Sequence, residues 1–425
     1  MVETLDKQSI KTDLGLRPID WLPIPISDFI KEFRGGAPLT PSDFRKIGFK
    51  VLPKVGVIRG GNLFIEKNKQ QYCSREYADS HKSNIIDNSF TIVVLRDLVP
   101  SGPNIGLMVR INSNEIYLLA QGVYGFKVDE PIDPDFLIHL SNTEDYRKVM
   151  RNIMVGSTQV HITNGTFKQV QIPLPPTKTE QTAIATALND ADALIHQLEQ
   201  LLTKKQNIKT GAMQELLKPK EGWEEKTLHE LADNKKELFD DGDWIEAEHI
   251  TDNGIRIIQT GNIGIGCYIE KENKKYIFEK SFYKLKCKLL IEGDLLVCRL
   301  AEPAGRACVL PNIDESKIVT SVDVTIFRPR EEVANRVFLA NLFSTSKWFT
   351  KVIERVGGTT HKRISRSSLG KILISIPKID EQNRIAKILT DMDNEIQELE
   401  RKLEKYKMLK QGMMQSLLTG KIRLV

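Results

Sequence analysis

Cysteine is scarce in this sequence, and its spacing excludes the usual structural roles of the thiol. Cys73, Cys267, Cys287, Cys298 and Cys308 form no CxxC pair, and four of them fall in the second half of the chain. Zinc ribbons need closely spaced thiolate pairs, and disulfide frameworks are typical of short secreted proteins. We therefore expect neither a bound metal nor a disulfide framework.

Long apolar runs are also missing. No stretch approaches the roughly 20 apolar residues of a membrane-spanning helix, and the segment from Met1 to Asp13 mixes charges without an apolar signal core. We therefore expect a cytoplasmic protein. With 40% hydrophobic and 28% charged residues the chain should fold. Its net charge of +5 permits a polyanionic partner but does not by itself indicate one.

The sequence lacks the motifs of two activities that act on DNA or nucleotides. It has no Asn/Asp-Pro-Pro-aromatic tetrapeptide, which an adenine methyltransferase would need, and no GxxxxGK[ST] phosphate-binding loop. Gly264-Ile-Gly266 is a lone GxG without a following helix, which argues against a dinucleotide site. We expect neither methylation nor ATP hydrolysis, and no catalytic centre.

What the sequence does contain is a tandem repeat. Apolar residues step by 4, 3, 4, 3 and 4 from Ile184 to Leu202, and the pattern returns from Ile385 to Tyr406. Glu-Gln opens both segments, displaced by 201 residues (382 − 181). This heptad spacing predicts two long helices that pair along an apolar seam. The predicted seam consists of Ile184, Leu188, Ile195, Leu198, Leu202, Ile385, Leu389, Ile396, Leu399, Leu403 and Tyr406.

The repeat extends upstream of these helices, since Trp223 matches Trp21 at a displacement of 202 residues (223 − 21). Each repeat is therefore predicted to be a mixed α/β domain followed by a long helix. We expect an N-terminal extension (1–20), a first domain (21–176), a first helical region (177–220), a second domain (221–377) and a second helical region (378–425).

The connections between these parts predict the topology. The second domain follows the first helix directly and leads directly into the second helix, so the two helices should run antiparallel. About 35 residues at about 1.5 Å each would span roughly 50 Å and separate the two domains. The expected arrangement is pseudo-two-fold and nearly circular.

The order domain, helix, domain, helix resembles the specificity subunits of type I restriction-modification systems. Further similar pieces are Gly-Met-Met-Gln-Ser-Leu-Leu-Thr-Gly (412–420), Gly-Gly-Ala-Pro (35–38), and segments 254–263 and 293–299. The first domain departs from the family pattern after Pro38, where 49–54 replaces the usual aromatic-rich strand. The resemblance covers nearly the whole chain.

The resemblance implies a non-catalytic, sequence-specific DNA-binding subunit. Each target-recognition domain would read one half of a split DNA sequence, and the helices would dock methylase subunits. It also implies two adenine-methyltransferase subunits, which bind S-adenosylmethionine, and two restriction subunits that use ATP. No cofactor is expected on this chain itself.

Two segments that precede the proline-marked strands are candidates for DNA contact. Each has a glycine, then small hydroxyl residues, then a basic or amide residue. Hydroxyl and backbone N–H groups suit phosphates, and a longer side chain suits a base edge. A solvated turn leading into an edge strand is the alternative. The candidates are Ser157, Thr158, Gln159 and His161 in the first domain, and Thr359, Thr360, His361, Lys362, Arg363 and Arg366 in the second.

Further candidates follow or connect predicted strands. Arginines at one strand end suit bidentate contact with guanine, and amides in turns between strands suit adenine. A surface salt bridge, or a turn that satisfies its own backbone, accounts for them equally well. These candidates are Arg299 and Arg306 at one strand end, Gln259, Thr260 and Asn262 in one turn, and Arg59 and Asn62 in another.

Two other functions stay open from the sequence alone. A coiled-coil scaffold that presents two protein-binding domains would retain DNA with little salt dependence, whereas DNA recognition predicts affinity that falls steeply with salt. An enzyme with a split active site would need acid–base or nucleophilic residues spread over the divergent loops, and the sequence gives no reason to propose one.

Overall fold

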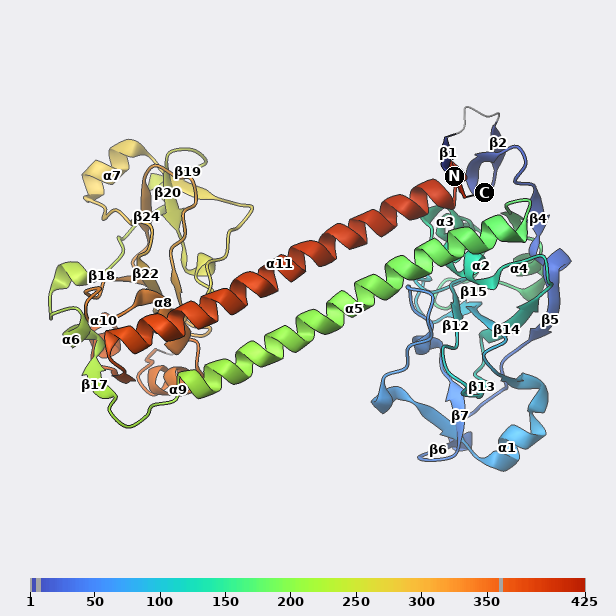
Figure 1. The fold of residues 1–425 in the computed structure, drawn as a ribbon, viewed down its shortest axis with the longest axis horizontal. Coiled ribbons are helices and arrows are strands. Elements are labelled where there is room, and N and C mark those ends of the chain that lie inside the picture. The colour runs from blue at the N-terminus through green and yellow to red at the C-terminus, as the bar shows by residue number, and fades with distance from the viewer. Residues whose placement is uncertain (1, 5–8, 359–361, 425) are drawn as a thin grey trace. The chain divides into compact units, whose positions relative to one another are not determined.

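The computed structural model describes residues 2–4, 9–358 and 362–424, which form two compact units (Figure 1). Unit 1 consists of residues 1–200 and 401–425, and unit 2 of residues 201–400. The unit boundaries fall within two 39-residue helices, α5 (Lys178–Leu216) and α11 (Ile379–Leu417). Their first residues differ by 201 (379 − 178), the offset of the sequence repeat.

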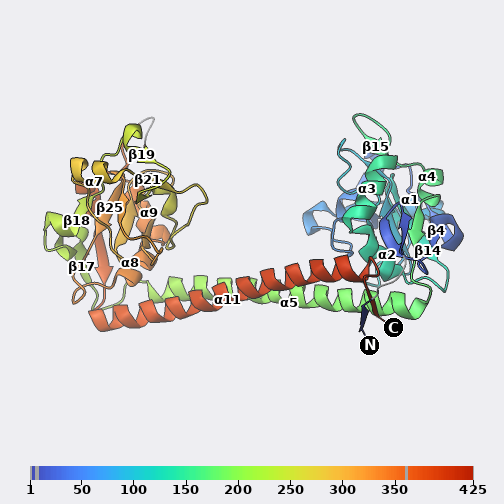
Figure 2. The ribbon, with the colours of Figure 1, turned by 90° about the horizontal axis from the view of Figure 1, so that it is seen from above.

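Helices α5 and α11 lie side by side in both units (Figures 1 and 2). In unit 1, Lys410 of α11 pairs with Asp192 of α5 at 2.5 Å. In unit 2, Lys209 of α5 pairs with Asp393 of α11, which is the same contact made by the repeat counterparts. Early residues of one helix thus meet late residues of the other, so the helices run antiparallel, as predicted. Such partly exposed pairs add about 0–1 kcal/mol each and serve mainly to fix the register.

The predicted seam positions are all buried or half-buried, and the ends of the helices belong to the domain cores. Unit 1 packs Ile184 and Leu188 with Leu417 in one hydrophobic cluster, and unit 2 packs Ile385 and Leu389 in another. The buried seam residues are Ile184, Leu188, Leu198, Ile385, Leu389 and Leu403, and the half-buried ones are Ile195, Leu202, Ile396, Leu399 and Tyr406.

Unit 1 builds its globular domain from two sheets and four helices. An antiparallel sheet has the order β12-β10-β14-β5, and a mixed sheet the order β6-β8-β7-β13-β9, in which β7 and β13 are parallel. The bounds are β5 (Ile30–Arg34), β6 (Phe44–Arg45), β7 (Phe49–Leu52), β8 (Gln71–Cys73), α1 (Arg75–Ser80), β9 (Ile85–Ile86), β10 (Thr91–Val94), β12 (Met108–Arg110), β13 (Tyr117–Leu119), β14 (Val123–Val128), α2 (Pro134–Ser141), α3 (Glu144–Ile153) and α4 (Asn164–Lys168).

Unit 2 repeats this plan. Its antiparallel sheet has the order β18-β25-β22-β23, and its mixed sheet the order β19-β21-β20-β24, in which β20 and β24 are parallel. The bounds are α6 (Leu228–Leu231), β18 (Phe239–Asp241), β19 (Ile250–Thr251), β20 (Ile255–Ile258), β21 (Lys275–Ile277), α7 (Glu279–Leu285), β22 (Leu295–Cys298), β23 (Ala307–Val309), β24 (Ile318–Thr320), β25 (Val324–Phe327), α8 (Arg336–Leu342), α9 (Ser346–Ile353) and α10 (Arg366–Gly370).

Short two-stranded pairings complete both units. Three of them lead into the long helices or join the ends of the chain: β4 (Pro23–Pro25) with β16 (Gln171–Pro173), β17 (Glu224–Thr227) with β26 (Leu373–Ile376), and β1 (Val2–Thr4) with β27 (Ile422–Leu424). Two others are the hairpin β2 (Ser9–Thr12) with β3 (Gly15–Pro18), and β11 (Arg96–Asp97) with β15 (Val160–His161). Among the helices in the described ranges, none combines the length and apolar character needed to cross a membrane.

Candidate nucleic-acid interface

The two loops predicted to contact DNA have the same construction in both units. In unit 1, Val155 and His161 exchange two backbone hydrogen bonds of 2.9 Å, which close a short loop after α3. In unit 2, Gly357 and Arg363 exchange two bonds of 3.0 Å after α9. Figure 2 shows β15, which holds His161, on the side of unit 1 that faces away from α5. The same pair of backbone hydrogen bonds therefore holds His161 in one domain and Arg363 in the other, and we call this shared backbone arrangement the frame.

The first loop exposes its tip. Ser157, Thr158 and Gln159 are all solvent-exposed. Gly156 makes the tight turn with φ +118°, and a Cβ there would lie 2.0 Å from the Gln159 carbonyl oxygen, so only glycine fits. The loop offers hydroxyl groups and an amide to a ligand, as the sequence predicted, and DNA contact by these residues stays a prediction.

A pair of cations beside this loop was missed in the sequence. Arg96 on β11 lies opposite His161 on β15, and a Cβ added at Gly122 would lie 2.8 Å from Arg96 Cβ and 3.5 Å from Lys54 Cδ. Burial and then the neighbouring Arg96 lower the pKa of Lys54. A phosphate between these cations would relieve their repulsion. The available signal was that Arg96 closely follows the apolar strand β10.

The second loop presents two exposed cations. Lys362 is solvent-exposed, and the Arg363 side chain is 48% exposed with Nη1 3.5 Å from Asp323 Oδ1. This is a loose ion pair that costs little to exchange for a phosphate or a base edge. Thr359, Thr360 and His361 lie outside the described residues.

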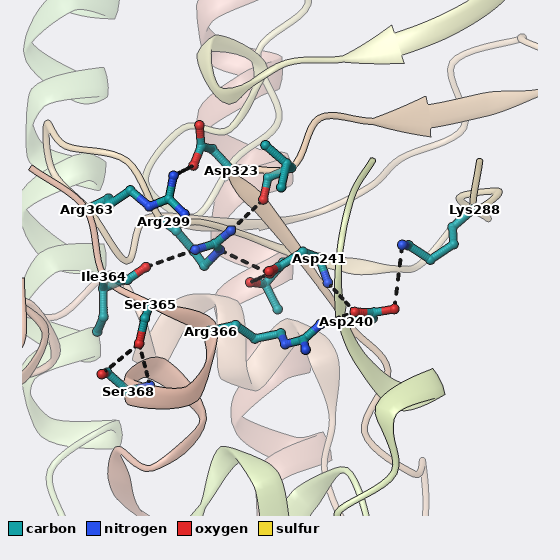
Figure 3. A network of polar contacts seen from close by, with 12 residues as sticks. Asp240, Asp241, Lys288, Arg299, Asp323, Arg363, Ile364, Ser365, Arg366 and Ser368 are labelled. Atoms are coloured by element: carbon teal, nitrogen blue, oxygen red, sulfur yellow. Dashed lines mark hydrogen bonds and ion pairs between the residues drawn. The ribbon is translucent and has the colours of Figure 1, made fainter. Parts of the chain in front are cut away.

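Arg299 does not project from its strand end as predicted (Figure 3). Its side chain is 2% exposed, and its Nε lies 3.0 Å from Asp241 Oδ1, an ion-pair distance outside hydrogen-bond geometry. Nη1 donates to the Ile364 carbonyl at 3.1 Å and Nη2 to the Val322 carbonyl at 2.6 Å. In this structure Arg299 is not available to DNA, and the prediction is corrected: it is a structural residue.

Arg306 and Asn262 also turn inward. Arg306 donates to four backbone carbonyl groups, including those of Ile263 at 2.8 Å and Thr260 at 3.0 Å. Asn262 is buried, accepts from the Gln259 N–H at 2.9 Å and donates to the Ile269 carbonyl at 2.9 Å. Both side chains hold the turn 259–263 in place, so the prediction that they reach DNA is corrected.

The remaining candidates divide by exposure. Arg366 begins α10 and forms an ion pair with Asp240, which leaves its side chain 34% exposed. Arg59 and Asn62 are exposed, and Arg59 Nη2 lies 3.9 Å from a carboxylate of α3. Gln259 and Thr260 are half-buried. For these five residues DNA contact stays a prediction.

Comparison with known proteins identifies the family. The model of the family described as type I restriction modification DNA specificity domain matches this chain twice, over residues 18–210 and 220–406. The chain belongs to this family. It is a DNA-specificity subunit of a type I restriction-modification system and not a catalytic one, as the sequence predicted, and the scaffold alternative is not favoured. Such a subunit works with DNA and with methylase and restriction partners.

Two curated relatives of this specificity subunit come from Methanocaldococcus jannaschii. The type I restriction enzyme MjaVIII specificity subunit is 26% identical, over 98% of this chain and 96% of the relative. The putative type I restriction enzyme MjaX specificity subunit is 24% identical, over 97% and 96%. Among solved structures, the S subunit from M. genitalium has a TM-score of 0.57 at 14% identity, covering 94% of this chain and 96% of that one. That likeness supports the predicted fold of two mixed α/β domains joined by paired helices.

Proposed function

We propose that each domain reads one half of a bipartite DNA target through its matched loop, 155–161 in unit 1 and 357–363 in unit 2. The observation that carries this proposal is that the same backbone frame presents different side chains in the two domains. His161 and Arg363 occupy the same register position, and the neighbouring residues differ in charge. A conserved frame with divergent exposed residues suits two different half-sites.

We further propose that α5 and α11 dock two adenine-methyltransferase subunits, which bind S-adenosylmethionine, and that two restriction subunits using ATP join the complex. The family membership supports partners of these kinds. The number of these partner subunits and the cofactors that they bind are part of what we propose. In this scheme the chain selects the sequence, and its partners perform the chemistry.

The salt dependence of DNA binding tests the second loop. In the assembled methylase, Lys362→Ala with Arg363→Ala should weaken DNA binding, since both cations are exposed. If both contact phosphates, the slope of log K against log salt should fall by about 2, because each lost phosphate contact removes about 0.9. Lys220→Ala, an exposed lysine in the linker before β17, is the matched control. Unchanged affinity and an unchanged salt slope would favour the alternative that this loop is a solvated turn without DNA contact.

Exchange of a domain tests independent readout. Replacing residues 21–170 with the corresponding domain of another family member should change one half of the methylated sequence and leave the other half intact. Methylation mapping by sequencing reads out both halves at once. If both halves change, the two domains do not read independently and the proposal fails.

A further inference from the structure

Unit 2 contains a cavity of about 870 Å³ between the end of α5 and the start of α9. Its apolar wall includes Met213, Leu217 and Trp348, and exposed Lys218 and Lys347 lie at its edge. The ion pair Lys209–Asp393 of the helix pair lies at one side of the cavity, and none of the candidate DNA-contact residues is among the described residues that line it. The sequence repeat allows its lining to be compared, residue by residue, with the matching place in unit 1.

In unit 1 the matching place is covered by the chain's own N-terminal hairpin, β2–β3 (Figure 1). Asp145, the counterpart of Lys347 (347 − 145 = 202), accepts from Arg17 Nη2 at 3.4 Å. Gly420, the counterpart of the lining residue Pro219 (420 − 219 = 201), lies so close that an added Cβ would be 2.5 Å from Pro18 Cγ.

The hairpin also contributes to the hydrophobic core of unit 1. Leu14, at its turn, is fully buried in a cluster that contains Tyr146 and Leu418. These two residues are the counterparts of Trp348 and Leu217, which line the cavity of unit 2. An apolar side chain therefore completes this surface in unit 1.

The second repeat cannot supply such a hairpin from its own sequence. Twenty residues precede Trp21, and they include β2 and β3, whereas Trp223 follows Leu217, the last buried residue at the end of α5, by only six residues (223 − 217). Residues 217–223 alone connect α5 to β17, and they leave no length for two strands. The second repeat therefore has no counterpart of the hairpin to cover this cavity.

The charge at the cavity is opposite to that at the hairpin site. The first turn of α3 carries two acidic residues, Glu144 and Asp145, and the first turn of α9 carries none. Among the described residues, those that line the cavity include four lysines, Lys209, Lys218, Lys347 and Lys351, and a single carboxylate, Asp393, which already pairs with Lys209. The hairpin of a second copy would bring its Arg17 to Lys347, and this repulsion disfavours a self-contact.

We propose that this cavity binds a segment of a partner polypeptide that inserts an apolar side chain beside Trp348 and places a carboxylate at Lys347. Such a segment would cover unit 2 as the N-terminal hairpin covers unit 1, with the charge of the ion pair reversed. The proposal concerns a protein contact and is independent of which residues read DNA.

A charge-swap experiment on the full-length chain tests the proposal. The probe is a fluorescein-labelled peptide of residues 9–18, closed head to tail, in two versions: unchanged and with Arg17→Glu. We expect the Arg17→Glu peptide to bind at least tenfold tighter in fluorescence anisotropy, and Lys347→Glu in the chain to reverse this preference. Circular dichroism checks that the Lys347→Glu chain is folded. Absence of binding at millimolar peptide, equal binding of both peptides, or a preference that survives Lys347→Glu would overturn the proposal.

A second measurement uses the assembled methylase. A photo-crosslinking amino acid at position 346, an exposed residue that lines the cavity and whose replacement leaves Lys347 in place, should form an adduct with an acidic segment of another subunit, identified by mass spectrometry. An adduct only with a second copy of this chain, or no adduct in a complex that assembles and binds DNA, would contradict the proposal and leave the DNA-reading function standing. If the unmodified complex bound DNA without sequence preference, that result would instead contradict the proposed function.

Discussion

Replacing Arg299 with methionine should destabilise unit 2 rather than weaken DNA contact directly. Methionine keeps much of the apolar stem but removes the guanidinium, which satisfies two backbone carbonyl groups and lies 3.0 Å from the Asp241 carboxylate. The Asp241 side chain is 20% exposed, so water would compensate it only in part. The variant therefore leaves a half-buried carboxylate that keeps a 2.9 Å hydrogen bond from Thr325 Oγ1 but loses its cation, and two carbonyl groups that lose their donor.

The magnitude follows from these losses. Removing one partner of a buried ion pair costs about 3–5 kcal/mol, and an unpaired buried carbonyl costs about 1–3 kcal/mol. Burial already raises the pKa of Asp241, and Arg299 opposes that shift. Without Arg299 the carboxyl group can take up a proton and relieve part of the penalty. We expect a net loss of about 3–5 kcal/mol in the free energy of unfolding of unit 2.

Urea denaturation of the full chain measures this loss, and Arg363→Met is the matched control. Arg363 is half-exposed in a loose ion pair with Asp323, so its removal should cost less than about 1 kcal/mol while lowering the DNA affinity of the assembled methylase. The reasoning is refuted if Arg299→Met stays within 1 kcal/mol of the parent and still loses more DNA affinity than Arg363→Met.

Four further predictions concern buried contacts of the long helices and of the residues packed against them, and each is measured by denaturation of the full chain. Arg423→Met should cost about 3–5 kcal/mol, because its carboxylate partner on α5 is 1% exposed; Glu381→Gln, at the half-buried counterpart of that carboxylate, should be nearly neutral. Burial lowers the pKa of His139, so folding favours the neutral ring and stability falls as the pH drops below the unfolded-state pKa of about 6.5. His139→Asn, the residue type found in the second repeat, should flatten that loss; an unchanged pH profile would contradict it. Leu198→Asp should cost about 3 kcal/mol through a buried charge, and equal melting would remove the seam. Gln382→Ala should cost about 1–3 kcal/mol, since it removes the amide that bonds an N-cap N–H and two carbonyl groups; unchanged stability would show that these contacts contribute nothing.

The helices and their direction were predictable because their signal is long, periodic and duplicated. Helix α5 begins at Lys178 and α11 at Ile379, beside the positions that the proline-marked strands and the Glu-Gln pairs indicated. The ion pairs Lys410–Asp192 and Lys209–Asp393 explain why these four polar residues recur at a fixed offset. A heptad pattern sums over many turns, so no single tertiary contact can override it.

The candidate DNA-contact residues were less predictable, because sequence position beside a strand does not reveal which way a side chain turns. Arg299 and Arg306 occupy the expected strand end, but nearby carbonyl groups from distant parts of the chain capture both guanidinium groups. Conversely, Lys54 and Arg96 carry no motif: the pairing of β11 with β15 brings Arg96 to the first loop, and Lys54 lies near Arg96 on the same side of Gly122. Both errors arise from contacts between residues far apart in sequence.

Some residues that are identical in the two repeats form the contacts between each domain and its long helix. The buried glutamines show this most directly. Gln181 accepts from the N–H of Asp133, the N-cap of α2, and donates to the Pro175 carbonyl. Gln382 makes the same two contacts, with the N-cap of α8 at 3.0 Å and with the Pro377 carbonyl at 2.8 Å. Each glutamine thus ties its domain to the start of a long helix.

These contacts persist although the spacing between proline and glutamine differs by one residue, six in the first repeat (181 − 175) and five in the second (382 − 377). The two repeats therefore share the contact rather than the spacing, as expected where a buried amide must satisfy two backbone groups. By the same logic, a position that is exposed in both repeats and holds different residues in them is not needed for the structure that the two repeats share. His161 and Arg363 meet both conditions, and so such positions, rather than the repeated identities, are where the two domains can acquire different half-sites.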